Sequence, residues 1–121
     1  MEKRLYWLRE EAAAGQKSFT TRIVHHELAH QWFGNILTID FWGGLWLNEG
    51  FATWMEQYAS THLKAKEISI TESYPQALEA DSVGSSHPIE VPVKRASDVL
   101  RNFDDISYAK GSNWYVGAIP R

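Results

Sequence analysis

Two histidines and a glutamate lie within about one helical turn of sequence, in the string His26-Glu27-Leu28-Ala29-His30. On an α-helix, residues four positions apart lie one turn apart on the same face, so both imidazoles can bind one metal ion. Glu27 follows His26 by about 100° around the helix axis, so its carboxylate stands beside the ion and can take a proton from water there. This spacing predicts a catalytic zinc site with its general base built into the motif.

A catalytic zinc site usually has three protein ligands and one open position, and two histidines with a glutamate are one known set. Glu49 follows His30 after 18 intervening residues. Asn48 can cap a second helix that begins near Glu49, and a connection of about a dozen residues can return this helix to pack beside the first. We therefore expect Glu49 to complete the zinc site. The alternative is an acid that only stabilises a helix N-terminus, which would be favoured if no histidine pair were present.

The neighbouring residues predict how the two helices are bounded and packed. Hydroxyl residues before the motif offer N-cap oxygens, and Gly34-Asn35 can end the first helix in a left-handed turn. Apolar residues at helical spacing predict one packed face on each helix, which argues against a solvated helix with two unrelated histidines. The cap candidates are Ser18, Thr20 and Thr21; the first face is Val24, Leu28 and Trp32; the second is Phe51, Trp54, Met55 and Tyr58.

Four strings of the chain resemble the aminopeptidase N family of zinc metallopeptidases, the gluzincin aminopeptidases, and most of all its puromycin-sensitive and fungal cytosolic branch. They are HELAHQWFGN (His26 to Asn35), LWLNEGFATW (Leu45 to Trp54), SSHPIEVPV (Ser85 to Val93) and FDDISYAKGS (Phe103 to Ser112). Several independent strings in the family's order, over residues 22–112, make a chance match implausible. The resemblance implies one zinc ion per chain, bound by His26, His30 and Glu49, with Glu27 as the general base.

The resemblance also implies a role for Tyr108, the tyrosine of Tyr-x-Lys-Gly, whose hydroxyl would stabilise the tetrahedral intermediate. A phenol is a neutral donor suited to a developing oxyanion. The residues alone favour a packed tyrosine of the core or rim, because Tyr108 lies between Ile106 and Lys110. The catalytic role therefore depends on the resemblance.

Both ends of the chain depart from the family pattern. The family's exopeptidase motif, Gly-x-Met-Glu-Asn, supplies a carboxylate for the free amino group of the substrate, whereas this chain begins Met1-Glu2-Lys3. We expect Glu2 to be a chance match to that motif. Residues 4–17 and 113–121 do not resemble the family either. We expect an atypical lead-in over residues 1–17 and a partial catalytic domain over residues 18–121, with the other domains of a larger enzyme missing.

Composition argues against several other classes of protein. The net charge is −3, with acids and bases interspersed, so there is no basic stripe for nucleic acid. There is no cysteine, which excludes disulfides and thiolate metal sites. No apolar run approaches the roughly 18 residues of a membrane span, and we expect a cytoplasmic protein. Trp32, Trp42, Trp46 and Trp54 lie in or between the motif helices, where we expect them to pack these helices or to be exposed for missing domains.

The remaining segments predict smaller elements. We expect a short helix over Ser73 to Asp81 interrupted by Pro75, an edge strand over Ile89 to Val93, a capped helix over Ser97 to Phe103 and another helix from Ile106. The histidines outside the motif are not expected to be ligands, because of their helical position or their distance in sequence; they are His25, His62 and His87.

Together these patterns predict a mainly α chain, the helical zinc-binding half of a thermolysin-like (gluzincin) catalytic domain. The implied function is a zinc-dependent aminopeptidase that removes N-terminal residues from peptides with a free N-terminus. A zinc endopeptidase stays open, because the motif is shared, and so does an inactive fragment with only a structural or partner-binding role. We expect the 121-residue chain alone to hydrolyse an aminoacyl anilide no faster than a zinc-stripped control, because nothing before Phe19 is seen to align a peptide.

Overall fold

The structure, a computed structural model, describes residues 14–63 and 73–118 and is built from helices. They are α1 (Ala14–Ala29), η2 (Trp42–Gly44), α2 (Leu45–His62), α3 (Ser73–Ser82), α4 (Ala96–Val99), η4 (Leu100–Asn102), the π-helical turn η5 (Ile106–Lys110) and α5 (Gly111–Ala118). Within the described ranges there is no strand, only an isolated bridge between Phe33 and Leu37. The predicted mainly α fold is confirmed, whereas the edge strand over residues 89–93 is wrong. In this part of the chain, no helix combines the length and the apolar character needed to cross a bilayer.

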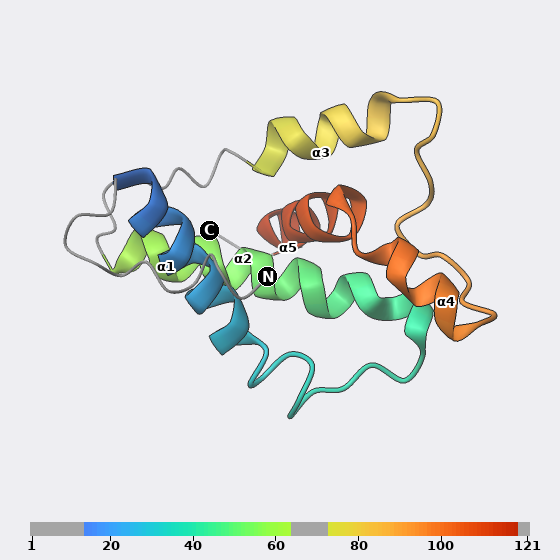
Figure 1. Cartoon of the computed structure of the whole chain (residues 1–121), viewed down its shortest axis with the longest axis horizontal. Helices are drawn as coiled ribbons and strands as arrows, with labels where there is room; N and C mark the ends of the chain where they lie inside the picture. Colours follow the sequence, from blue (N-terminus) through green and yellow to red (C-terminus); the bar gives the residue numbers. More distant parts are fainter. Residues whose placement is uncertain (1–13, 64–72, 119–121) are drawn as a thin grey trace.

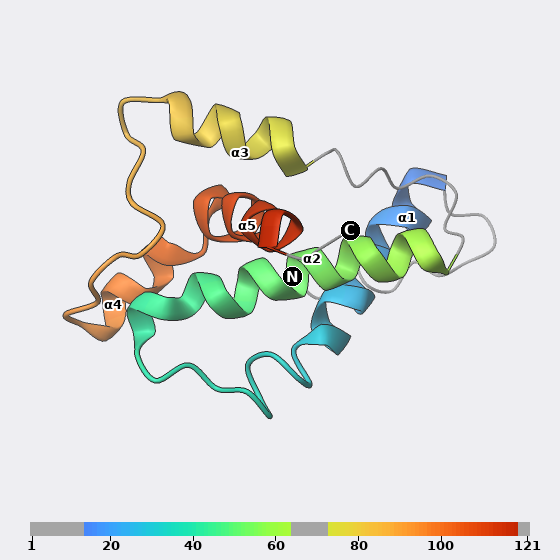
Figure 2. The same ribbon diagram turned by 180° about the vertical axis from the view of Figure 1, so that it is seen from behind.

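Helix α2 is the centre of the arrangement. Helix α1 crosses it on one side, α5 runs along another side, and α3 lies beyond α5 (Figure 1; Figure 2 shows the same order from behind). The buried residues of α2 include no aromatic one, and after Leu45 all of them are small or polar: Glu49, Gly50, Ala52, Thr53, Glu56, Gln57 and Ser60. Small side chains let the neighbouring helices approach closely, so α2 presents its acids directly to α1.

The aromatic face predicted for α2 is therefore wrong as the packed face. Phe51 and Trp54 are partly exposed, and Tyr58 is 45% exposed. These rings pack on one another along the helix, with Phe51 and Trp54 at 5.1 Å and Trp54 and Tyr58 at 5.3 Å between ring centroids. Periodic spacing identified a real aromatic row, but this row flanks the buried face.

Helix α1 differs from the prediction in its start and in its packed side. All three residues proposed as caps lie inside the helix: Ser18, Thr20 and Thr21. The hydroxyl of Thr21 donates to the carbonyl of Lys17 at 2.8 Å. The predicted apolar face is exposed, with Val24 at 42%, Leu28 at 54% and Trp32 at 56%. The side that meets α2 carries Thr20, His26 and Ala29 instead. The expected packing of this stripe is wrong, because α2 covers the histidine side.

Three other boundaries also differ. Helix α2 begins at Leu45 after Gly44, so Asn48 lies in its first turn and is not the cap. Pro75 lies in the first turn of α3, where a missing N–H costs no hydrogen bond, so it does not interrupt that helix. The predicted helix over residues 97–103 is split into α4 and η4, and the helix predicted from Ile106 is present as η5 and α5.

Two glycines bring α2 and α5 into backbone contact. A Cβ added to Gly50 would lie 2.7 Å from the carbonyl carbon of Gly111 and 2.8 Å from its Cα. A Cβ added to Gly111 would lie 3.1 Å from the Cα of Gly50 and 3.2 Å from the carbonyl oxygen of Trp46. No side chain fits between the helices at this point, so the contact fixes their separation.

Replacing Gly50 by alanine is expected to destabilise the fold. The added methyl group meets backbone that cannot rotate away, and such overpacking typically costs about 1–3 kcal/mol. The free energy of unfolding, measured by urea denaturation and circular dichroism, should fall by that amount. Gly15→Ala is the control, because Gly15 lies in α1 with nothing within 4 Å of the added Cβ. The free energy of unfolding of this control should stay the same or rise by up to about 1 kcal/mol. Equal losses of stability in the two variants would contradict the close contact.

Candidate metal centre

His26, His30 and Glu49, the three residues predicted as ligands, lie together between α1 and α2. The Nε2 atoms of the two histidines are 3.1 Å apart. Glu49 Oε2 lies 3.1 Å from His26 Nε2 and 3.5 Å from His30 Nε2. In the described ranges this is the one group of three or more histidine or acidic residues that could hold a metal ion.

The spacing of these three atoms fits a tetrahedral zinc ion. Zinc binds imidazole nitrogen at about 2.0–2.1 Å, which requires neighbouring ligand atoms about 3.3 Å apart in a tetrahedron. The three observed separations, from 3.1 to 3.5 Å, bracket that value. Two imidazoles and one carboxylate leave the fourth position for water or substrate, which is the composition of a catalytic rather than a structural zinc site.

The opposite nitrogen of each imidazole is held by an acceptor. His26 Nδ1 lies 3.4 Å from Oε2 of Glu56, and His30 Nδ1 lies 2.9 Å from the carbonyl oxygen of Phe33. Because both partners only accept, both Nδ1 atoms carry the proton, and the Nε2 atoms face the shared point. Such outer hydrogen bonds are the usual way in which a protein orients metal-binding histidines.

The turn after α1 supplies the carbonyl that holds His30. The helix ends at Ala29, and the chain turns through Gly34, whose φ is +117°. This value is strained for any residue with a Cβ, so glycine is required there. The predicted left-handed turn at Gly34 is thus present, although α1 ends at Ala29 and not at Gly34-Asn35. This turn brings the Phe33 carbonyl back onto His30.

The cluster carries charges of both signs, which stabilise one another. Burial opposes ionisation of His26, but hydrogen bonds to Glu49 and Glu56 outweigh it and raise its pKa to about 9. Burial likewise opposes ionisation of Glu49, but its bonds to His26 and His30 lower its pKa to about 2. Glu49 is therefore an anion at neutral pH, the form that binds a cation, and metal binding at imidazoles generally displaces protons.

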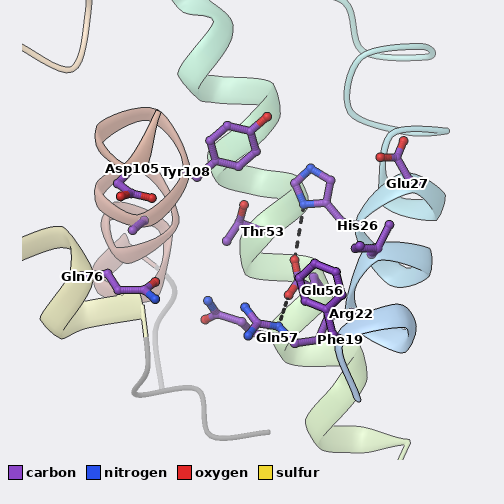
Figure 3. A pocket seen from close by; sticks show the side chains of 12 residues that line it. Phe19, Arg22, His26, Glu27, Thr53, Glu56, Gln57, Gln76, Asp105 and Tyr108 are labelled. Carbon is purple, nitrogen blue, oxygen red and sulfur yellow. Dashed lines mark hydrogen bonds and ion pairs between the residues drawn. The ribbon is translucent and has the colours of Figure 1, made fainter. Parts of the chain in front are cut away.

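Glu27 lies on the exposed side of α1, at the edge of a hollow of about 440 Å³. Figure 3 shows Glu27 and Tyr108 on either side of His26, the first on α1 and the second on η5. The lower part of this hollow is lined by polar side chains of α1 and α2, among them Arg22 and Gln57. Glu27 lines the same hollow as His26 and is not part of the three-residue cluster.

Tyr108 reaches the same cluster from the other side of α2. Its ring stacks on His26 with 5.7 Å between centroids and 27° between planes. Burial raises the pKa of Tyr108, and the charge of Glu49 adds to the shift. The phenol therefore keeps its proton at neutral pH and remains a hydrogen-bond donor beside the imidazole.

The profile of the Peptidase family M1 domain matches residues 1–117. The chain belongs to peptidase family M1. Aminopeptidase 2 of Candida albicans is 52% identical over 108 residues, which are 86% of this chain and 12% of that protein. Aminopeptidase 2, mitochondrial, of Saccharomyces cerevisiae is 55% identical over 95 residues, 75% of this chain and 10% of that protein. Endoplasmic reticulum aminopeptidase 1 of Mus musculus is 43% identical over 115 residues, 92% of this chain and 12% of that protein.

Membership of family M1 confirms the family resemblance seen in the sequence. The chain spans only 10–12% of the length of these three relatives. The match also includes residues 1–17, which were predicted as an atypical lead-in. Glu2, the candidate for the exopeptidase motif, lies outside the described residues.

Glu56 is the residue of this M1 site that sequence patterns missed. It lies seven positions after Glu49, two turns along the same face of α2, and it is only 6% exposed. One of its oxygens faces His26 and the other forms an ion pair with Arg22, as the dashed lines in Figure 3 show. The sequence pattern that could have identified Glu56 is its spacing of seven residues from the candidate ligand Glu49 on the same helix.

The other histidines and tryptophans of the M1 chain lie outside the cluster. His25 bonds to the hydroxyl of Ser60 at 2.9 Å, and His62 bonds to the carbonyl of Tyr58 at 2.8 Å. Trp32 and Trp42 are 56% and 61% exposed, so the expectation that they pack the helices is wrong for these two. The exposed alternative considered for the tryptophans describes them correctly.

Proposed function

We propose that this chain carries the zinc-binding centre of an aminopeptidase that removes N-terminal residues from peptides. Its family, and relatives that are named aminopeptidases, support a peptidase of this type. The observation that carries the proposal is the convergence of His26, His30 and Glu49 with tetrahedral spacing. A cytoplasmic location stays a prediction, because the names of two relatives refer to the mitochondrion and the endoplasmic reticulum.

The proposed ligands are Nε2 of His26, Nε2 of His30 and Oε2 of Glu49, with one zinc ion per chain. Bound zinc supplies Lewis-acid chemistry, which polarises a carbonyl group and acidifies water. Glu56 and the Phe33 carbonyl hold the two imidazoles in the orientation that this binding needs.

The proposed general base is Glu27. Its carboxylate takes a proton from the attacking water and passes it to the amine that leaves. The position of Glu27 beside His26, at the edge of the same hollow, supports this role. A base must be within reach of the attacking water without occupying a ligand position. That Glu27 lines the same hollow as His26 and is not part of the cluster supports this role.

Tyr108 is proposed to donate its hydroxyl proton in a hydrogen bond to the carbonyl oxygen as that oxygen becomes negative. A phenol that keeps its proton can donate this hydrogen bond without being ionised itself. Burial raises the pKa of Tyr108 and so keeps it protonated. The hollow between α1, α2 and η5 is the proposed place for the peptide. A group that binds the free amine of the substrate is required in addition, and Glu2 is a candidate outside the described residues.

Hydrolysis assays test the proposed function directly. The protein, expressed from its whole gene, should release the amine from a free-amine aminoacyl anilide and not from the same compound after N-acetylation. A chelator should remove the activity, and zinc should restore it, with one zinc ion per chain in the active form. Preference for the N-acetylated compound, or for internal bonds of a long peptide, would instead indicate an endopeptidase. Turnover that survives complete removal of metal would contradict the proposal.

A further inference from the structure

The segment between α3 and α4 is tied to the start of the helical turn that carries Tyr108. His87 Nε2 lies 2.6 Å from Oδ2 of Asp104, and His87 Nδ1 lies 2.7 Å from the carbonyl oxygen of Pro88. A carboxylate and a carbonyl only accept, so both ring nitrogens donate and His87 is an imidazolium. The bond to Asp104, with that to Pro88, accordingly raises the pKa of His87. The contact is a charge-assisted hydrogen bond, which is about twice as strong as a neutral one.

Asp104 uses its other oxygen and its backbone to begin the turn. Oδ1 accepts the backbone N–H of Ser107 at 3.0 Å, and the Asp104 carbonyl accepts the N–H of Tyr108 at 3.0 Å. A side chain that accepts the N–H three residues ahead acts as a helix cap. Asp104 therefore sets the direction in which residues 106–108 leave the loop.

The far end of the turn is tied down by a second pair. Lys110 Nζ lies 2.7 Å from Oδ1 of Asp81 on α3, and the same oxygen accepts the hydroxyl of Ser86 at 3.1 Å. The π-helical turn thus has an ionic contact next to each end: Asp104 just before it pairs with His87 of the segment after α3, and Lys110 at its end pairs with Asp81 on α3. Turns of this kind are rare and often occur at functional sites, and the two ionic contacts restrain this one from outside.

We propose that His87 and Asp104 form a positioning pair for Tyr108, which holds the phenol against His26 in the orientation needed to donate to the substrate. The inference rests on the proposed function, in which Tyr108 bonds the carbonyl oxygen. His87 belongs neither to the lining of the proposed peptide hollow nor to the metal cluster, so it would act only through the turn. Neither the zinc content nor the binding of the rest of the peptide depends on it.

A kinetic double-mutant cycle tests the pair in the protein expressed from its whole gene, with a free-amine aminoacyl anilide as substrate. His87→Ala should lower kcat by about 10- to 100-fold. This loss is smaller than that for removal of an oxyanion donor itself, which typically lowers kcat by about 10²- to 10³-fold. KM should change less than about 2-fold, because the lost interaction belongs to the transition state. In a Tyr108→Phe background, His87→Ala should have almost no further effect, because its effect passes through the hydroxyl.

A conservative variant and a matched control make the cycle specific. His87→Gln keeps one donor to Asp104 and should retain more activity than His87→Ala. If His87→Ala does not fold, the cycle is measured with His87→Gln in its place. Arg95→Gln removes another ion pair, 3.7 Å from Asp98 in the same part of the chain, and should leave kcat unchanged. Additive losses of kcat in the cycle, or a loss of zinc in the His87 variants, would show general damage and overturn the proposal.

Nuclear magnetic resonance separates failure of this proposal from failure of the proposed function. In the 121-residue chain, the stacked rings of Tyr108 and His26 should give an Overhauser contact, given their 5.7 Å centroid separation. His87→Ala should abolish this contact while Arg95→Gln keeps it, even if the whole protein hydrolyses no anilide. A contact that persists in His87→Ala overturns the positioning role whatever the assays show.

Discussion

Replacing Glu27 by glutamine is expected to lower kcat for an aminoacyl anilide by about 10²- to 10⁴-fold, the usual contribution of a general base. The amide keeps the shape of the carboxylate but cannot take a proton. Zinc content should stay at one ion per chain, because Glu27 lies outside the cluster of His26, His30 and Glu49. Parallel measurement of kcat and of zinc by atomic emission in the protein expressed from its whole gene checks both halves of this expectation.

Two further variants show whether the carboxylates are assigned correctly. Glu49→Ala should lose zinc and activity together, because it removes a ligand. Glu79→Gln, an exposed acid on α3 away from the hollow, should change neither. If folded Glu27→Gln protein lost its zinc while Glu49→Ala protein kept it, the roles of base and ligand would have to be exchanged.

The second large effect is expected for the double variant His26→Ala, His30→Ala. Loss of even an outer partner of a ligand costs about 10- to 100-fold in metal affinity, so loss of two of three ligands should leave no zinc after dialysis. The measurement is zinc per chain in the purified protein, together with helix content by circular dichroism.

The chain offers a matched control for this experiment. His25 on α1 bonds to the hydroxyl of Ser60, and His62 on α2 bonds to the carbonyl of Tyr58. The control variant His25→Ala, His62→Ala therefore also removes two imidazoles, both of them outside the cluster. This variant should keep one zinc per chain. Equal zinc in the two double variants would mean that the metal is held elsewhere.

Local spacing predicted the histidine side of the site well. The four-residue interval between His26 and His30 has one geometric meaning on a helix, and the structure has their Nε2 atoms 3.1 Å apart. Glu49 was harder, because a separation of 18 residues says nothing about position until a second helix returns to the first. The resemblance to a known family supplied that step, and also the role of Tyr108.

The packing of the helices could not be predicted in the same way. Periodicity marks a face as apolar, yet it does not say whether another element covers it, and Val24 and Leu28 are exposed. The buried face of α2 was missed for the opposite reason. Ala52 and Ser60 are fully buried there because they are small, and small residues leave little trace in an apolar pattern.

Glu56 shows a third limit of sequence reasoning. An isolated acid on a helix is usually solvated, and only the approach of His26 and Arg22 from α1 makes it part of the site. Its role depends on the crossing of two helices, which no pattern within either helix reveals.

The contact between Gly50 and Gly111 also bears on how this chain can change over evolution. Gly50 follows Glu49 directly, and Gly111 lies three residues after Tyr108. The backbone contact between these glycines therefore sets how closely α2, which carries Glu49, approaches α5, which follows the turn η5 that carries Tyr108. Other walls of the hollow, such as Phe19 on α1 and Gln76 on α3, take no part in that contact. Substitutions at these wall positions therefore leave the backbone contact in place, so the lining of the hollow can vary in evolution while α2 and α5 keep their separation.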